Sequence, residues 1–296
     1  MMLLLGLPHG ATDYSLFKAM DKHNISRRKM VFYLMYGGLI GLYGLVWLLL
    51  PLCAFLLFLL LAIYHFGQSN WSYVSYRRTA WGSLHFMLWG AGVLFTPILL
   101  HGGEAAAIVA KMTGWNLTIP TYEVALTTII ILGVLNMLAI GRLRYDGQLS
   151  RKRAWIELAA YGLLMGVFFT NSLLLGFTIY FVFWHSLGSM LDQLRYFRTN
   201  LGNYSRRQFL LEIAPVVLGA LAFCLFAWFW LEPGMVLSPA LIGGVFVAIS
   251  LLTLPHMILV DQLYRGWRSS AKTITLPVVS KNNSTNSSSA DLSASS

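Results

Sequence analysis

The chain has 296 residues, of which 57% are hydrophobic and only 11% are charged, and its formal net charge is +10. This apolar fraction is too large for the core of one soluble domain, so the composition excludes a soluble protein and predicts a polytopic membrane protein. Cys53 and Cys224 lie in apolar runs without metal-ligand spacing, and we expect them to be buried structural thiols.

A membrane-spanning helix needs about 20 mostly apolar residues. Eight candidate stretches follow one another along the chain: residues 30–50, 52–66, 81–100, 121–141, 154–170, 172–190, 211–231 and 238–260. We therefore predict an all-α fold, a transmembrane bundle of about eight spanning helices over residues 30–264. Residues 1–29 would form an N-terminal segment and residues 265–296 a disordered, serine-rich tail. Four glycines of the first helix are expected to pack closely against a neighbouring helix: Gly37, Gly38, Gly41 and Gly44.

Basic residues gather in every second connection between these helices. They occupy residues 18–29, 77–78, 142–153, 195–207 and 265–281, whereas the other connections hold a single lysine, Lys111. By the positive-inside rule, the basic connections and both termini face the cytoplasm, which predicts a multi-pass protein of the inner (cytoplasmic) cell membrane. The positive charge is therefore explained by topology and lipid, and a nucleic-acid partner is not expected.

Four histidines are predicted to lie at one depth near the cytoplasmic side. They are His9 before the first helix, His65 at the end of the second, and His185 and His256 in later helices. Imidazoles are costly in an apolar layer unless they have partners, so a shared depth indicates a common site. The alternative for His185 is a structural histidine with a local partner. His85, between Trp81 and Trp89, is typical of aromatic packing, His101 lies at the outer end, and His23 belongs to a solvated basic run.

Four neutral imidazoles in one layer are suited to a transition metal, and to iron above all for oxygen chemistry. Asp13, Asp192 and Asp261 follow His9, His185 and His256 by four, seven and five residues, so each carboxylate is placed to accept the second ring N–H of its histidine. The alternative is that these aspartates pair with arginines of the loops.

The motifs GLPHGATD, YHFGQSNW, FWHSLGSM and TLPHMILVDQLY, in this order and spacing, resemble the Brp/Blh family of β-carotene 15,15′-dioxygenases over residues 6–264. The resemblance implies an Fe(II)-dependent membrane enzyme that uses dioxygen to split β-carotene at its central double bond into two molecules of retinal. It also implies that the retinal is supplied to a microbial rhodopsin apoprotein. His9, His65 and His185 match family positions proposed as iron ligands. We expect the polyene to enter from the bilayer into a groove lined by aromatic side chains: Tyr64, Phe66, Phe181, Phe183 and Trp184.

The chain differs from the family pattern at two places. Founding members read HxxxH at the third motif, whereas Ser189 stands four residues after His185 here. We assign the fourth ligand to His256, because a serine hydroxyl is a poor ligand for iron(II). The alternative is that His256 caps a carbonyl freed by Pro255 and that the site is built around the turn from His185 to Ser189. In addition, only eight residues precede His9, which predicts a further apolar helix encoded upstream.

Two other functions fit the same residues. One is a different membrane iron oxygenase that acts on a lipid or another carotenoid, and a product assay separates it from the first. The other is a non-catalytic relative that binds carotenoid or retinal, which the iron content of the purified protein would distinguish.

Overall fold

The computed structural model describes residues 10–20, 25–74, 80–201, 204–230, 235 and 238–274, and within them it contains helices and no strand. His9 and the tail from residue 275 lie outside the described residues. In chain order the elements are α1 (Asp13–Met20), α2 (Ile25–Leu49), α3 (Pro51–Asn70), α4 (Ala80–Leu100), α5 (Gly102–Thr113), α6 (Tyr122–Tyr145), α7 (Arg151–Thr170), α8 (Leu173–Ile179), the π-helix η3 (Tyr180–Ser186), α9 (Leu187–Asn200), α10 (Arg206–Trp230) and α12 (Pro239–Ile274).

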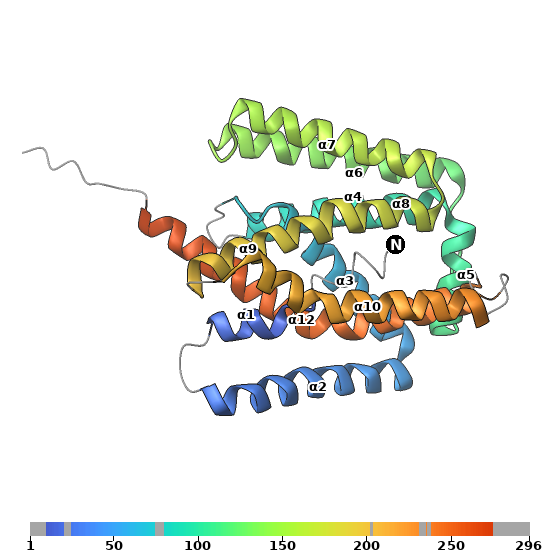
Figure 1. Cartoon of the computed structure of the whole chain (residues 1–296). Helices are drawn as coiled ribbons and strands as arrows, with labels where there is room; N and C mark the ends of the chain where they lie inside the picture. Colours follow the sequence, from blue (N-terminus) through green and yellow to red (C-terminus); the bar gives the residue numbers. More distant parts are fainter. Residues whose placement is uncertain are drawn as a thin grey trace, which may run out of the picture.

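The long helices lie side by side in a bundle, which confirms the predicted all-α fold (Figure 1). Helices α6 and α7 form one side and α2 the other, with α4, α3 and α12 between them. Seven candidate spans in the described chain are long and apolar enough to cross a membrane. The remaining predicted span, residues 154–170, forms α7, which is not among these seven. The first two turns of α7 carry Arg151, Lys152, Arg153 and Glu157.

Local sequence explains where several helices begin and end. Pro51 stands at the first position of α3, where a backbone N–H would have no partner within the helix. α2 ends at Leu49, so Leu50 alone connects the two helices. Ser150 caps α7 by accepting a hydrogen bond from the backbone N–H of Arg153 at 3.2 Å. Several helices extend past the predicted bounds. α3 continues to Asn70, so His65 lies inside it, and α12 continues to Ile274, past the predicted end of the bundle at residue 264.

Helices α3 and α4 pack closely against each other, and two glycines there face backbone carbonyls. A Cβ atom on Gly67 would overlap the carbonyl of Phe86, and one on Gly90 would overlap the carbonyl of Ile63. The expectation for the first helix was wrong at three of its four glycines: a Cβ on Gly37, Gly38 or Gly41 would meet no atom within 4 Å, and one on Gly44 would make an ordinary contact of 3.8 Å with Leu251. The small residues that allow close packing are therefore on α3 and α4, which hold His65 against the core.

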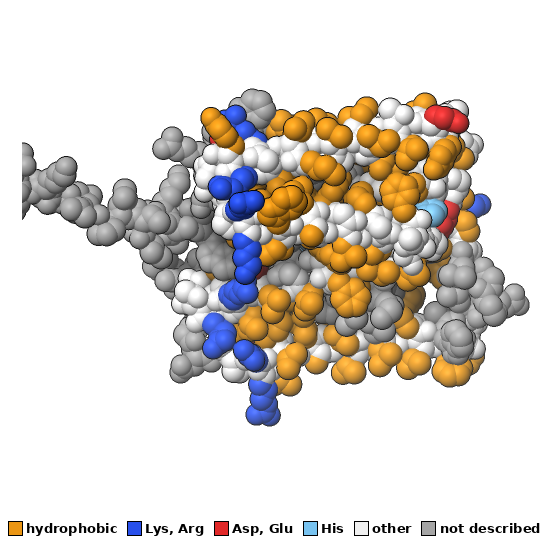
Figure 2. Space-filling model, turned by 90° about the horizontal axis from the view of Figure 1, so that it is seen from above, with side chains coloured by type: hydrophobic (Ala, Val, Ile, Leu, Met, Phe, Trp, Pro, Cys, Tyr) orange, Lys and Arg blue, Asp and Glu red, His pale blue; other side chains and the backbone are white. Residues whose placement is uncertain are grey.

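The charges on the visible face are segregated along the bundle. Figure 2 shows most of the visible lysine and arginine side chains gathered at its left end, with apolar side chains over the middle. His101 and α5 lie at the opposite end, where Lys111 is also found. The two ends thus differ in the way that the charge pattern of the loops predicted.

Candidate functional site

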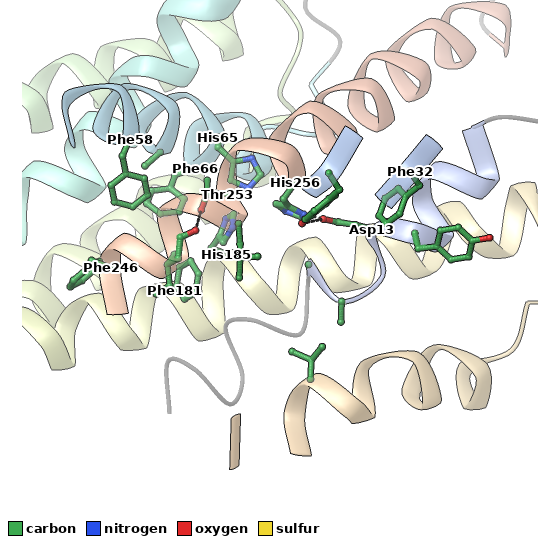
Figure 3. A pocket seen from close by; sticks show the side chains of 18 of the residues that line it. Asp13, Phe32, Phe58, His65, Phe66, Phe181, His185, Phe246, Thr253 and His256 are labelled. Atoms are coloured by element: carbon green, nitrogen blue, oxygen red, sulfur yellow. Dashed lines mark hydrogen bonds and ion pairs between the residues drawn. The ribbon is translucent and has the colours of Figure 1, made fainter. Parts of the chain in front are cut away.

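Three of the four predicted histidines meet in the interior, each from a different element. His65 comes from α3, His185 from η3 and His256 from α12, and their exposed fractions are 2%, 2% and 5%. The ring centroid of His65 lies 4.8 Å from that of His185 and 5.5 Å from that of His256, both edge to face (Figure 3). Residues far apart in the sequence therefore form one cluster of imidazoles.

The fourth predicted histidine, His9, lies outside the described residues. The described chain begins at Gly10, where a Cβ atom would be 3.8 Å from Nδ1 of His256. Gly10 also lines the same cavity as the three histidines. The residue that follows His9 in the sequence is therefore beside the cluster, and the participation of His9 stays a prediction.

His185 is carried by a π-helical stretch between two α-helices. Such stretches, with hydrogen bonds to the fifth residue along, are rare and frequent at functional sites. Phe177, Phe181 and His185 follow one another at intervals of four, and their rings stack with centroid distances of 5.9 and 5.4 Å. Phe66 contacts His185 from α3 at 4.9 Å. The local geometry thus places the imidazole at the end of a column of aromatic rings.

Two of the three predicted carboxylates have partners other than the histidine predicted for them, and the third pairing involves a residue outside the described chain. Asp13, expected beside His9, contacts His256, with its Oδ1 2.7 Å from the ring Nδ1, and its pairing with His9 stays a prediction. Asp261, expected beside His256, accepts a hydrogen bond from Gln68 at 2.7 Å. Asp192 accepts from Ser72 at 2.9 Å and pairs with Arg195 at 3.3 Å, so for this aspartate the alternative of a loop arginine holds. A spacing of four to seven residues therefore did not identify the partners of Asp192 and Asp261. Asp261 bonds to Gln68 of another helix, and Asp192 bonds to Ser72 and Arg195.

Ser189 and His256 are placed differently relative to the cluster. Ser189 is buried and its hydroxyl lies 2.9 Å from that of Ser69, outside the set of residues that line the cavity. His256 lines the cavity, and its Nδ1 contacts Asp13 on another helix, so this atom does not cap a carbonyl of its own helix. Of these two positions, His256 is the one that joins the other imidazoles.

A cavity of about 380 Å³ contains the histidine cluster and is otherwise mainly apolar. Phe66 and Phe181 line it, as predicted. Phe183 does not and is 55% exposed, while Tyr64 and Trp184 pack against the core next to it. The sequence did not identify four lining phenylalanines: Phe32, Phe58, Phe177 and Phe246. Of these, only Phe177 could have been found from the sequence, because it lies four residues before Phe181 and so on the same face of the helix. On the other side of the cluster the cavity is lined by Phe32 and three tyrosines: Tyr14, Tyr33 and Tyr36.

The donor set suits a transition metal that binds imidazole, such as iron. Among the described residues, no three His, Cys, Asp or Glu side chains are already arranged to hold a metal ion. The fit to iron consequently depends on the donor chemistry and on the proximity of three buried rings in one cavity.

His85 and His101 do not join the cluster. Nε2 of His85 lies 2.8 Å from the carbonyl oxygen of Ala139, on the far side of α4. His101 precedes α5 at the other end of the bundle. His101 is where the sequence indicated, and His85 stays outside the cluster but contacts a backbone carbonyl, so its expected aromatic packing stays a prediction.

Comparisons with known proteins point to one family. A family model described as beta-carotene 15,15′-dioxygenase matches residues 1–264. A protein named beta-carotene 15,15′-dioxygenase, from uncultured marine bacterium 66A03, is 26% identical over 276 residues, covering 92% of this chain and 94% of the relative. No solved structure matches the chain.

Proposed function

The chain belongs to the β-carotene 15,15′-dioxygenase family, and from that premise we propose that it cleaves β-carotene with dioxygen at the central double bond, giving two molecules of retinal. The observation that carries the proposal is the cluster of three buried histidines in an apolar, aromatic-lined cavity of a membrane protein. A cavity of a few hundred Å³ with few polar groups is typical of a site for an apolar ligand.

The proposed cofactor is iron(II), held by His65, His185 and His256, with His9 as the fourth ligand. Imidazole is a common ligand of iron, and the three rings are supplied by separate helices, so the bundle would fix their relative positions. When bound, iron supplies the activation of dioxygen that a polyene cannot provide by itself.

The protein's own contribution is to hold one double bond beside the histidines and to exclude water. The rings of Phe66 and Phe181 contact His185, so a flat polyene lying on these rings would pass the cluster. The reaction breaks one carbon–carbon double bond, and each of the two carbons takes one oxygen atom of dioxygen as an aldehyde. No proton is gained or lost overall, so the stoichiometry requires no acid–base residue.

Access from the bilayer is proposed beside two lining residues that are partly exposed on the surface. Leu252 of α12 and Tyr33 of α2 both line the cavity, and they are 41% and 62% exposed. A carotene dissolved in the hydrocarbon layer could then reach the histidines without crossing water.

Expression in a β-carotene-producing host tests the function. We expect β-carotene to disappear and retinal to accumulate at two molecules per molecule lost, because cleavage at the central bond gives two identical halves. Chromatography of the extracted pigments measures both compounds, with a host carrying the empty vector as control. Shorter or longer aldehyde fragments would contradict central cleavage, and unchanged carotene would contradict an oxygenase acting on it.

We also propose that the basic end of the bundle and both termini face the cytoplasm of the inner membrane, because lysine and arginine gather at that end. In a background with Cys53 and Cys224 replaced by alanine, Gln148→Cys should react with an impermeant thiol reagent only after the cells are opened. Asn116→Cys, an exposed position after α5, should react in intact cells. The reverse pattern would show that the chain is inserted the other way round.

A further inference from the structure

The carboxylate of Asp13 is in an unusual position for a charged group in a membrane protein. It is 2% exposed and lies in the first turn of α1, where both of its oxygens are engaged. Oδ1 is 2.7 Å from Nδ1 of His256, and Oδ2 accepts a hydrogen bond from the Tyr36 hydroxyl at 2.8 Å. Figure 3 shows His256 between Asp13 on one side and His65 on the other.

This contact determines which ring nitrogen of His256 carries the proton. An ionised carboxylate can only accept hydrogen bonds, so Nδ1 must be the donor, and in a neutral imidazole Nε2 then keeps its lone pair. Nε2 is on the opposite edge of the ring from Asp13. The hydrogen bond therefore turns the electron-pair donor of His256 toward the other imidazoles and away from α1.

The pairing is supported by packing that does not depend on the hydrogen bond. Leu16 and Ala19 of α1 are buried in the same cluster as Leu259 and Leu263 of α12. Because these contacts fix α1 against α12 one to two turns from the site, Asp13 and His256 are held in register. Tyr36 of α2 then fixes the second carboxylate oxygen, so three helices position this one group.

The charge of Asp13 is also informative. In the described chain its ion-pair partner is His256, whose ring is charged only if protonated. A buried carboxylate beside a neutral ring is costly in free energy, whereas a cation bound at Nε2 would balance its charge across the imidazole. The same arrangement, a carboxylate behind a metal-binding histidine, orients the ring and raises its basicity in many metal sites.

We propose that Asp13 is a positioning residue that acts through His256: together with Tyr36 it fixes the Nδ1–H form of the ring and presents Nε2 to the metal. The proposal rests on the proposed function, because it takes iron(II) as the cation at the histidine cluster. Asp13 borders the cavity, but both of its carboxylate oxygens are taken by His256 and Tyr36, so it acts on the metal through His256.

The test is Asp13→Asn, which keeps the shape of the side chain and removes its charge. We expect affinity for iron(II), and for cobalt(II) as a spectroscopic probe, to fall about 10- to 100-fold, the usual loss when the carboxylate behind a ligand is removed. Metal titration of purified protein in detergent, followed by the visible absorption of cobalt, measures this without turnover. In activity assays kcat should fall at a fixed iron concentration while KM for β-carotene stays the same, because the aromatic walls are unchanged.

Glu157→Gln is the matched control, since it makes the same carboxylate-to-amide change at a buried position away from the cavity. Glu157 is 5% exposed, pairs with Arg153 at 2.8 Å and accepts the Tyr73 hydroxyl at 2.7 Å. Burial raises the pKa of the Tyr73 phenol, and the charge of Glu157 raises it further. Loss of this carboxylate should leave metal affinity unchanged even if thermal stability falls.

A double-mutant cycle with His256→Ala distinguishes positioning from general stability. If Asp13 acts through His256, adding Asp13→Asn to His256→Ala should weaken metal binding no further, whereas independent effects would add. Should Asp13→Asn fail to fold, Tyr36→Phe removes one hydrogen bond from the carboxylate and should weaken metal binding in the same direction, by less. Wild-type metal affinity in Asp13→Asn, or in Tyr36→Phe where that variant replaces it, overturns the role of Asp13 alone. A wild-type protein that binds no metal overturns the proposed function as well.

Discussion

Alanine in place of His65 or His185 should abolish retinal formation while leaving the protein in the membrane. Each ring is 2% exposed and lines the cavity, and the two centroids are 4.8 Å apart. Removal of a ligand should cost more than the roughly 10- to 100-fold loss typical of removing a group behind a ligand, so we expect activity to fall by more than about 100-fold. Retinal in extracts of the β-carotene-producing host measures the effect.

His101→Ala is the control for this pair, because it removes an imidazole at the other end of the bundle. Its retinal yield per unit of membrane-inserted protein should equal that of the wild type. Full activity in His65→Ala or His185→Ala, at wild-type protein levels, would remove the histidine cluster from the reaction.

Alanine at Gly67 or Gly90 should prevent stable folding of the bundle. At each position the new methyl group would overlap a backbone carbonyl of the facing helix, and a backbone cannot move aside as a side chain can. The loss should exceed the roughly 1–3 kcal/mol typical of overpacking, because α3 and α4 would have to separate. Thermal unfolding in detergent, monitored by gel filtration of the remaining monodisperse protein, measures the loss.

Gly37→Ala provides a matched control, since a methyl group there would meet no atom within 4 Å. In a helix interior this change should stabilise slightly, by about 0.5–1 kcal/mol, because glycine loses more backbone freedom on folding than alanine does. A large loss in Gly37→Ala with none in Gly90→Ala would indicate that the close contact is made by α2.

The position of the site residues along the bundle could be predicted from sequence, because apolar spans and basic loops are visible in it. That position alone was enough to predict that His65, His185 and His256 lie at the same level of the bundle. It did not identify the partners of Asp13 or Asp261, since these depend on how each helix is rotated about its axis. Hydrophobic residues surround most helices of a membrane bundle, so periodicity gives little information about that rotation.

The same limit explains the errors in packing. α2 carries as many glycines as α3 and α4 together, yet Gly67 and Gly90 are the ones that face a neighbouring backbone. Likewise Phe183 and Phe181 are equally apolar and two residues apart, but only Phe181 faces the cavity. The π-helical turn at η3 shifts the register of its side chains, and the sequence carried no clear sign of it.

Iron bound per chain, measured in purified protein and its variants, tests most directly that the histidine cluster is an iron site. We predict about one iron ion per chain in the wild type and in Ser189→Ala, and little in His185→Ala or His256→Ala, because imidazole binds iron(II) far better than a serine hydroxyl does. Retention of iron in His256→Ala together with its loss in Ser189→Ala would contradict the ligand set. Full activity in a wild-type protein that contains no iron would contradict the account as a whole.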